Sequence, residues 1–185
     1  MKEYYTMTIA GLERNLPLCP LNEKLMIGAF VIFGDPELTT ACAEALNARI
    51  PEHDVMITAE SKGIPLICEM ARLQGNKPYV LARKAPKLYM RDVIAVDVNS
   101  ITTAKKQTLY LDGYDAEYMK GKRIVIVDDV ISTGESLHAL EELVKQAGGN
   151  IVGRMAILAE GDATERDDII FLEKLPLFDA EGNAL

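Results

Sequence analysis

One segment restricts the possible folds of this 185-residue chain more than any other. Four apolar residues at 124–127 (IVIV) run directly into two carboxylates, Asp128 and Asp129, and a polar stretch at 132–136 (STGES) follows. A continuous apolar run of this length is typical of a strand buried on both faces of a parallel sheet. The acids then lie at the carboxyl end of a central strand, where open α/β sheets bind their ligands.

The chain around this segment supports the same architecture, because strand-like apolar runs alternate with helix-like segments. A helix over residues 36–46 has Asp35 as its candidate N-cap and Pro36 in its first turn. Strands separated by helices predict an α/β fold with an open, mainly parallel sheet flanked by helices on both faces. The other helices are expected at 63–73 and 136–146, and the strands at 55–58, 79–82, 124–127, 151–158 and 169–172.

Two stretches depart from this alternation. Residues 1–30 lack it, so we expect them to form a small hood against the sheet edge of a single domain, 1–185, whose core is 31–175. Apolar runs at 93–98 and 108–111 predict a β-ribbon. The polar stretch 99–107 that joins them is expected to be either a flexible loop or a simple exposed hairpin turn.

The polar stretch after the acids has the chemistry of a phosphate cradle. Ser132, Thr133 and Ser136 offer hydroxyl donors, and Gly134 permits a tight turn. Backbone N–H groups at the start of a helix lack partners within the helix and favour an anion. Two adjacent acids beside such a cradle are suited to hold the hydroxyls of a sugar whose phosphate fills it.

Other classes of protein use parts of this pattern. Receiver domains begin with an apolar strand that ends in two acids, whereas Asp128 and Asp129 lie in the last third of this chain. An isolated Ser-Thr-Gly-Glu-Ser stretch would be typical of an ordinary helix N-cap, but joined to the strand and its acids it indicates a binding loop. The sequence contains no GxxxxGK[ST] motif, which excludes the common nucleotide hydrolases.

Composition limits the partners and the compartment. The net charge of −8 argues against binding to nucleic acid, which requires a basic surface. Three cysteines without CxxC spacing and only two histidines make a thiolate or imidazole metal cage improbable and fit a reducing compartment. The N-terminus lacks a signal-peptide pattern, and no apolar run is long enough to span a bilayer. We therefore expect a cytoplasmic protein that binds neither nucleic acid nor membrane.

In the segment from residue 124 to 136 the chain resembles the type I phosphoribosyltransferase family. The resemblance implies that Asp128 and Asp129 contact the ribose hydroxyls and hold a magnesium ion indirectly, through those hydroxyls or water. It also implies a cradle for the 5′-phosphate. Its residues are Ser132, Thr133, Gly134, Glu135 and Ser136, with Glu135 where the family often has glycine.

Two further motifs extend the resemblance. One follows the strand expected at 55–58 and resembles the pyrophosphate loop of adenine-type members, with Lys62 in place of arginine; its residues are Glu60, Ser61, Lys62 and Gly63. The other follows the strand expected at 79–82 and resembles the family's second pyrophosphate-contacting segment; its cations are Arg83, Lys84 and Lys87. Taken alone, the first could be an ordinary strand-to-helix turn and the second a solvated charged surface.

The family resemblance implies an activity and a set of partners. The donor would be 5-phosphoribosyl-1-pyrophosphate (PRPP), bound with Mg²⁺, and the acceptor a purine base, in a homodimeric enzyme of purine salvage. The family closes a mobile loop over its substrates, and here that loop is 99–107 with Lys105 as a catalytic cation. Closure of such a loop keeps water away from the reactive ribosyl cation.

The base itself is not identified by these residues. The layout resembles adenine phosphoribosyltransferases, which favours adenine. However, Thr102 or Thr103 occupies the place of that branch's loop glutamate. A xanthine- or guanine-type transferase is the alternative among catalysts, and a PRPP-binding regulator or a homologue without turnover is the alternative outside them. No base-binding residue is assigned, although apolar residues at 16–20 and 30–33 could sandwich a flat ring.

Overall fold

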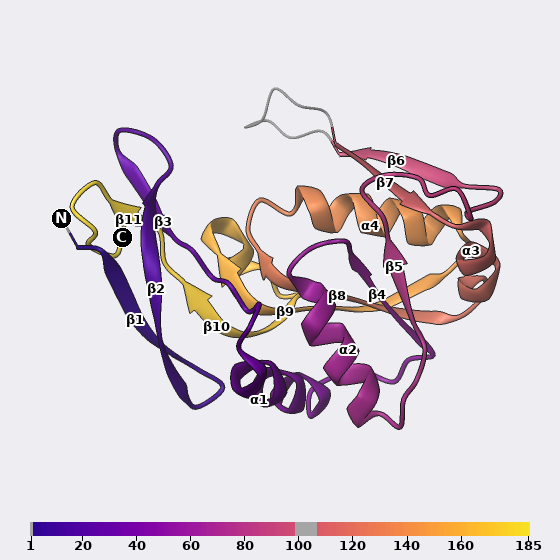
Figure 1. Ribbon diagram of the computed structural model, residues 1–185, viewed down its shortest axis with the longest axis horizontal. Helices are drawn as coiled ribbons and strands as arrows, with labels where there is room; N and C mark the ends of the chain where they lie inside the picture. The colour runs from indigo at the N-terminus through magenta and orange to yellow at the C-terminus, as the bar shows by residue number, and fades with distance from the viewer. Residues whose placement is uncertain (1, 99–106) are drawn as a thin grey trace.

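A computed structural model describes residues 2–98 and 107–185 of the chain. At its centre is a five-stranded parallel sheet with the strand order β10-β9-β8-β4-β5 (Figure 1). The strands are β4 (Val55–Ala59), β5 (Tyr79–Ala82), β8 (Arg123–Ile131), β9 (Asn150–Glu160) and β10 (Ile170–Leu175). The predicted fold class, an open parallel sheet flanked by helices, is confirmed.

The apolar run of β8 is buried because helices cover both faces of the sheet. Ile124 and Ile126 contribute to one core cluster, whereas Val125 and Val127, which point to the opposite face, contribute to the other. All four side chains are completely inaccessible to solvent. Successive residues of a strand point to opposite faces, so a strand covered on both sides must be apolar at every position.

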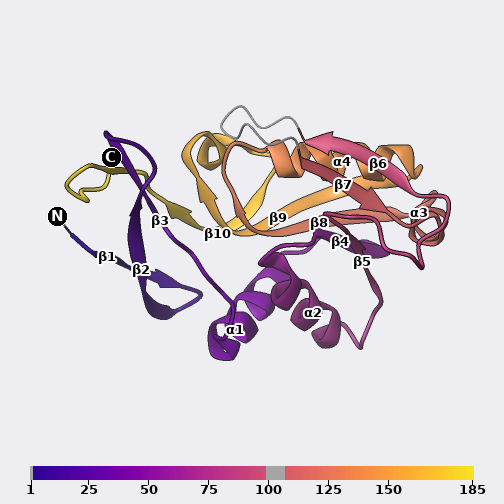
Figure 2. The ribbon, with the colours of Figure 1, turned by 45° about the horizontal axis from the view of Figure 1, so that its top comes forward.

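Two helices cover one face of the sheet, and two further helices with a β-ribbon cover the other (Figures 1 and 2). On the first face lie α1 (Pro36–Asn47) and α2 (Gly63–Leu73). On the second lie α4 (Glu135–Gln146), the short helix α3 (Gly113–Met119) and the ribbon of β6 (Ile94–Val98) with β7 (Gln107–Leu111). The predicted N-cap of the first helix is confirmed, since the Asp35 carboxylate accepts a hydrogen bond from Leu38 N–H at 3.0 Å.

The N-terminal residues form most of a separate antiparallel sheet with the order β1-β2-β3-β11. Its strands are β1 (Tyr4–Ile9), β2 (Leu12–Pro20), β3 (Leu25–Gly28) and β11 (Phe178–Asp179). The C-terminal β11 therefore completes this sheet, whereas the predicted hood contained residues 1–30 alone. This sheet stands beside the β10 edge of the parallel sheet, with the two chain termini close together (Figures 1 and 2).

Three features of the chain were not predicted. Strand β8 continues through both acids to Ile131 instead of ending before them. Helix α3 and the 3₁₀ turn η1 (Gly161–Glu165) lie in segments that carry little periodic signal. Residues 99–106 of the predicted mobile loop, including Thr102, Thr103 and Lys105, lie outside the described residues, and Gln107 begins β7.

Candidate active site

The two acids occupy a stretch of β8 that has lost one of its neighbouring strands. Pairing with β4 ends at Ile126, whereas pairing with β9 continues through Asp128 and Ile131. Both acids therefore lie where β8 has separated from β4, which continues to Ala59 beside β5. Both are buried, at 7% and 5% exposure for Asp128 and Asp129. Polar groups at the carboxyl end of a parallel sheet lie where such folds bind their ligands.

Asp128 is held in place by two donors. Its Oδ1 accepts a hydrogen bond from the backbone N–H of Asp129 at 2.9 Å and one from Ser61 Oγ at 3.4 Å. Burial, and after it the negative charge of Asp129, raises the pKa of the Asp128 carboxyl to about 7. A carboxylate kept in such a site costs folding stability, which is typical of residues retained for chemistry.

The turn Glu60–Gly63 packs directly on the acids. Lys62 Nζ lies 3.0 Å from Asp129 Oδ2 and also donates a hydrogen bond to the carbonyl of Phe30 at 2.5 Å. Gly63 leaves no space for a side chain, since a Cβ there would lie 2.6 Å from Thr58 Oγ1 and 3.3 Å from Asp128 Oδ1. The predicted turn is therefore in contact with the predicted acids.

The basic segment after β5 is joined to the same turn by Glu60. The carboxylate of Glu60 accepts a hydrogen bond from the backbone N–H of Lys84 at 2.9 Å, and its Oε1 lies 3.1 Å from Arg83 Nη2. These contacts, with the charge of Lys87, lower the pKa of Glu60. Arg83 is also bonded to the ribbon, exchanging two 2.8 Å backbone hydrogen bonds with Tyr110.

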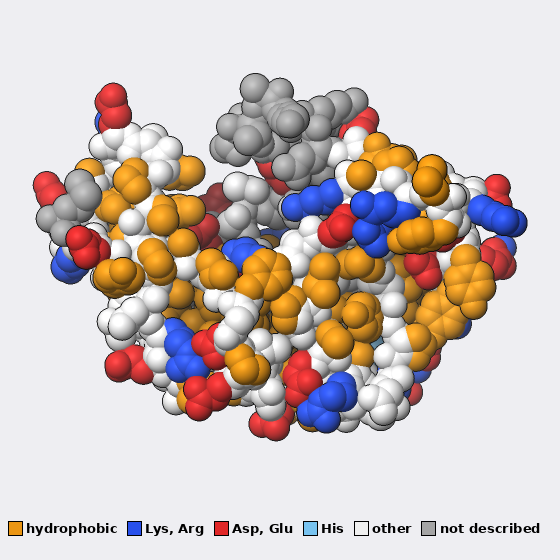
Figure 3. Space-filling view, viewed as in Figure 1, with side chains coloured by type: hydrophobic (Ala, Val, Ile, Leu, Met, Phe, Trp, Pro, Cys, Tyr) orange, Lys and Arg blue, Asp and Glu red, His pale blue; other side chains and the backbone are white. Residues whose placement is uncertain are grey.

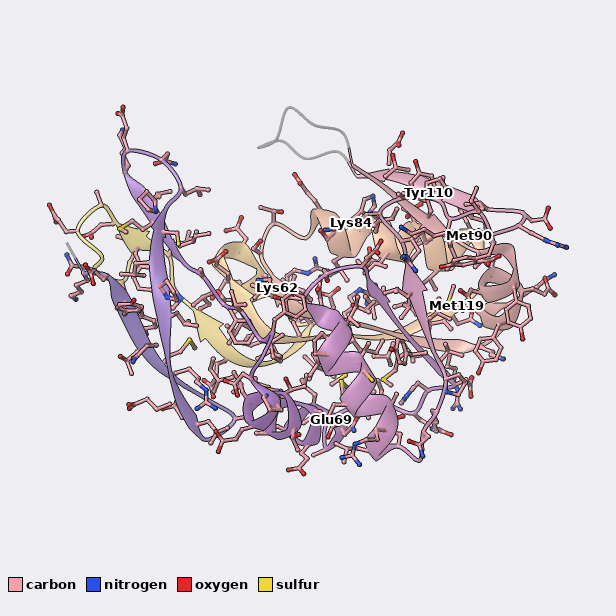
Figure 4. All side chains as sticks on the ribbon, in the orientation of Figure 1. Lys62, Glu69, Lys84, Met90, Tyr110 and Met119 are labelled. Atoms are coloured by element: carbon pink, nitrogen blue, oxygen red, sulfur yellow. The ribbon has the colours of Figure 1, made fainter. Side chains whose placement is uncertain are left out.

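An open cavity of about 430 Å³ lies beside this turn. Figure 4 shows Lys62 at the start of α2 and Lys84 beyond the end of β5, both in this region of the molecule. In the space-filling view the surface is hollowed between the antiparallel sheet and the α/β core, with Lys and Arg side chains near the rim (Figure 3). The cavity is lined by Phe33, Glu60, Ser61, Lys62, Ile64 and Lys84.

The predicted phosphate loop forms the start of α4. Gly134 adopts a left-handed backbone conformation, with φ of +80°, and serves as the N-cap of the helix that begins at Glu135. A small recess of about 40 Å³ is lined by Asp128 and by the loop residues 130–137. The first N–H groups of α4 have no acceptor within the helix, so an anion in this recess would meet a ready donor set.

Two charged residues near the site were not predicted. Glu160, the last residue of β9, follows Ala159, which pairs with Ile131 at the end of β8. Burial raises the pKa of the Glu160 carboxyl, while the charge of Lys62 lowers it. Arg166, just beyond η1, lies beside Gly134 of the phosphate loop. The rule that selected the β8 acids would also have found Glu160, whereas Arg166 follows an irregular turn that gives no sequence signal.

The apolar segments near the hollow divide between core and surface. Phe30 and Ile32 are buried at 2% and 1% exposure, whereas Val31 and Phe33 are exposed at 54% and 56%. In the other segment Leu16 and Leu18 are buried as well. Alternation directs half of these side chains into the core, so only the exposed ones, such as Phe33 at the cavity, are placed to contact a flat ring.

Residues 2–98 and 107–185 contain no group of three or more His, Cys, Asp or Glu side chains that could hold a metal ion. Within the same described part of the chain, no helix is both long and apolar enough to cross a membrane.

The fold and the site together define an α/β domain in which acids, cations and a helix N-terminus meet at the carboxyl edge of a parallel sheet. The chain belongs to the phosphoribosyltransferase family, because residues 35–180 match the phosphoribosyl transferase domain. This confirms the type I resemblance drawn from the three sequence motifs.

Relatives that are similar in sequence include hypoxanthine/guanine phosphoribosyltransferases. A hypoxanthine/guanine phosphoribosyltransferase of Methanococcus maripaludis strain C6 is 32% identical over 159 residues, which cover 82% of each chain. A protein of the same name from Methanococcus vannielii is 32% identical over 158 residues, or 81% of each chain.

Solved structures agree with the fold. Adenine phosphoribosyltransferase from Saccharomyces cerevisiae superimposes with a TM-score of 0.66 at 20% identity, over 92% of this chain and 94% of that one. The adenine enzyme of Thermoanaerobacter pseudethanolicus gives the same TM-score at 23% identity, over 77% and 84% of the two chains. At these identities the likeness establishes the fold alone.

Proposed function

We propose that this protein transfers the 5-phosphoribosyl group of PRPP to a purine base and releases pyrophosphate. The observation that carries the proposal is the direct contact among the predicted segments. The turn Glu60–Gly63 is hydrogen-bonded to Asp128, and the same strand β8 leads from Asp128 into the phosphate loop. The residues proposed to bind the ribose, the pyrophosphate and the 5′-phosphate are thus adjacent. PRPP requires this, because it contains all three groups in one molecule.

In this reaction the bond from the ribose anomeric carbon to the pyrophosphate oxygen breaks, and a bond to a purine ring nitrogen forms. Pyrophosphate leaves with the electron pair of the broken bond, and the proton lost by the attacking nitrogen passes to solvent. Asp128 and Asp129 hold the ribose hydroxyls and place negative charge beside the ring as it becomes cationic. Their burial increases this effect, since charges interact more strongly where water is excluded.

The cations of the site bind the leaving group. Lys62, Arg83, Lys84 and Lys87 offset the charge that pyrophosphate gains, and Ser61 and the backbone at Gly63 supply further donors. Glu60 acts through these groups, because its carboxylate is bound to Arg83 and to the backbone of Lys84. The predicted loop cation Lys105 would join them when the loop closes.

The 5′-phosphate is held by the loop at the start of α4. Backbone N–H groups and the hydroxyls of Ser132, Thr133 and Ser136 donate to it, and the helix dipole adds a favourable field. Gly134 allows the turn that points these N–H groups in one direction. Glu135, in the first helical turn, can favour the dipole with its carboxylate directed to solvent.

The donor set fits magnesium. Mg²⁺ is usually held by one or two carboxylates, water and substrate phosphates, and this site offers two adjacent carboxylates, with Asp129 Oδ2 buried and approached only by Lys62 among the described residues. Asp128 and Asp129 would hold it indirectly, through ribose hydroxyls or water. When bound, the ion supplies positive charge at the departing pyrophosphate.

For the base, the curated relatives favour a 6-oxopurine. Those at 32% identity are named for hypoxanthine and guanine, whereas the adenine enzymes are similar in fold at 20–23% identity. We therefore propose hypoxanthine or guanine as the first acceptors to test, with adenine, which the sequence layout favoured, as the second. The cellular setting proposed is cytoplasmic purine salvage, by a homodimer.

A panel of bases tests the proposal. Purified protein is incubated with PRPP and Mg²⁺ plus adenine, hypoxanthine, guanine, xanthine, uracil or orotate, and pyrophosphate release is measured. We expect release with one or more purines, stopped by EDTA and restored by excess Mg²⁺. Lack of release with every base would refute the transferase, and PRPP binding measured in the same samples would then identify a PRPP-binding regulator.

A further inference from the structure

Arg166 lies beside the phosphate loop in space, although it is distant from the loop in sequence. It follows η1, in the connection between β9 and β10, and is 32 positions away from Gly134. A Cβ built on Gly134 would meet Arg166 Nη1 at 3.4 Å, which is an ordinary van der Waals contact. The guanidinium therefore borders Gly134, one of the residues that line the small recess.

The orientation of this guanidinium is set by Asp168. Arg166 Nε donates to Asp168 Oδ1 at 2.8 Å, and Nη2 donates to Asp168 Oδ2 at 2.7 Å. A bidentate pair of this kind fixes the plane of the guanidinium. Because Nε and Nη2 are occupied by the carboxylate, Nη1 is the nitrogen directed toward Gly134.

Asp168 is in turn connected to the helix that the loop begins. Arg154 Nε lies 3.5 Å from Asp168 Oδ2 and 2.5 Å from Glu141 Oε1, and Glu141 belongs to α4. The chain of contacts thus runs from α4 through Arg154 and Asp168 to Arg166, and returns to the start of α4. A cation held in this way loses little conformational freedom when a ligand arrives.

The loop itself contains no cation. Residues 130–137 include Glu135 but neither lysine nor arginine, so its own contribution to a phosphate dianion consists of N–H and hydroxyl dipoles. A guanidinium beside it would add a positive charge, shared with Asp168, and a charge-assisted hydrogen bond from Nη1, which is roughly twice as strong as a neutral one.

We infer that Arg166, oriented by Asp168, is a binding residue for the 5′-phosphate of the ribose substrate. The inference rests on the proposed function, because it assigns a further residue to the 5′-phosphate part of that site. It also gives Arg166 a different role from Lys62 and Arg83, which are proposed to bind the pyrophosphate. A substrate with a 5′-phosphate should depend on Arg166, and pyrophosphate alone should not.

The test compares two ligands that divide the site. Ribose 5-phosphate and Mg²⁺-pyrophosphate are each titrated by calorimetry into the full-length wild-type protein and Arg166→Gln. The expected result is a roughly tenfold loss of affinity for ribose 5-phosphate, the scale of one lost hydrogen bond to a charged group, with pyrophosphate affinity within twofold of wild type. Arg166→Lys should recover part of the loss, because it restores charge without the bidentate geometry.

The matched control is Arg72→Gln, which removes an exposed arginine of α2 that pairs with Glu69. It should leave both affinities unchanged. If Arg166→Gln does not fold, Asp168→Asn keeps the cation and releases its orientation, and it should weaken ribose 5-phosphate binding severalfold while pyrophosphate binding stays constant.

Two outcomes would overturn the inference. Unchanged ribose 5-phosphate affinity in Arg166→Gln, or in Asp168→Asn if that variant is used, means that Arg166 does not reach the phosphate. An equal loss for both ligands means that the substitution loosens the whole site. If the wild-type protein binds neither ligand, the proposed function itself fails, which is a different result from a wild type that binds both without depending on Arg166.

Discussion

Lys62 Nζ lies 3.0 Å from Asp129 Oδ2, so a cation expected to bind pyrophosphate is paired with an acid expected to bind ribose. The same ammonium donates to the carbonyl of Phe30, next to strand β3 of the antiparallel sheet. Lys62 thus connects the sugar part of the site to the segment that links the two sheets. In the absence of substrate it also neutralises one of two adjacent buried carboxylates.

Replacement of Lys62 should therefore affect both binding and stability. In Lys62→Met, Asp129 loses its counter-charge, and the KM for PRPP should rise about tenfold, the scale of one lost contact to a charged group. The loss of unfolding free energy should stay below about 3 kcal/mol, because Lys62 is 37% exposed and solvent screens the pair. Steady-state kinetics and urea unfolding measure the two effects.

Lys62→Arg is the matched control, since it keeps the charge and restores the residue that the family has at this position. Its KM and stability should remain close to wild type. A methionine variant with normal PRPP kinetics would show that Lys62 balances charge in the free protein and does not bind the leaving group.

Neutralising the acids should separate activity from stability. Asp128→Asn and Asp129→Asn each remove a carboxylate that faces the ribosyl cation, so kcat should fall roughly 10²–10³-fold, as for removal of one electrostatic stabiliser. The raised pKa of Asp128 means that its charged form costs the folded state stability above the unfolded pKa. Asp128→Asn should thus melt at or above the wild-type temperature in a thermal scan at neutral pH. Normal kinetics in both variants would remove the acids from the mechanism.

Sequence reasoning predicted the parallel sheet, because the apolar run of its central strand is uninterrupted and strand-like runs alternate with helix-like segments. Asp35 marks a helix start that can be recognised from residue type alone. The two acids could also be predicted from the sequence, since an apolar run that ends in carboxylates is unusual. These features depend on local pattern, which a single sequence contains.

Features that depend on distant contacts could not be predicted. The short β11 joins the N-terminal sheet only because Phe178 packs among residues of that sheet, with its ring 4.9 Å from that of Tyr5. Strand β8 continues past its acids because β9 still pairs with it there. The approach of Arg166 to Gly134 follows the path of an irregular turn, which has no periodicity to detect.

Gly63→Ala should damage the site although it replaces no charged residue. The new Cβ would lie 2.6 Å from the buried Thr58 Oγ1 and 3.3 Å from Asp128 Oδ1, so the turn must move away from the acid. We expect kcat/KM for PRPP to fall at least about tenfold, because misplacement of reacting groups by about 1 Å can cost 10²-fold. Gly75→Ala is the control. Its φ of +84° makes alanine strained by about 1–2 kcal/mol, but no heavy atom lies within 4 Å, so stability should fall while kinetics stay normal.

The cysteines should differ in reactivity toward a thiol reagent. Burial raises the pKa of the Cys42 thiol to about 12, and this side chain is fully inaccessible, whereas Cys68 is exposed. The thiolate is the reactive form, so at pH 8 Cys68 should be modified quickly and Cys42 only after unfolding. Mass spectrometry of the labelled native protein checks this, with Cys68→Ser as the control. Fast labelling of Cys42 would mean that α1 separates from the sheet.

Glu60 should act by positioning cations, which predicts a change in KM rather than kcat. Glu60→Ala removes the acceptor of the Lys84 N–H and the partner of Arg83, so the basic segment is released from the turn. The KM for PRPP should rise about tenfold, and the KM of Glu60→Gln, which can still accept from Lys84 N–H, should fall between those of Glu60→Ala and wild type.

Because the pKa of Glu60 is lowered, its contribution to folding stability is present above the unfolded pKa and is lost only as pH falls through the lowered folded value. The KM difference between wild type and Glu60→Gln should therefore be constant from pH 6 to 8. A fall in kcat with an unchanged KM would instead place Glu60 at the reacting atoms.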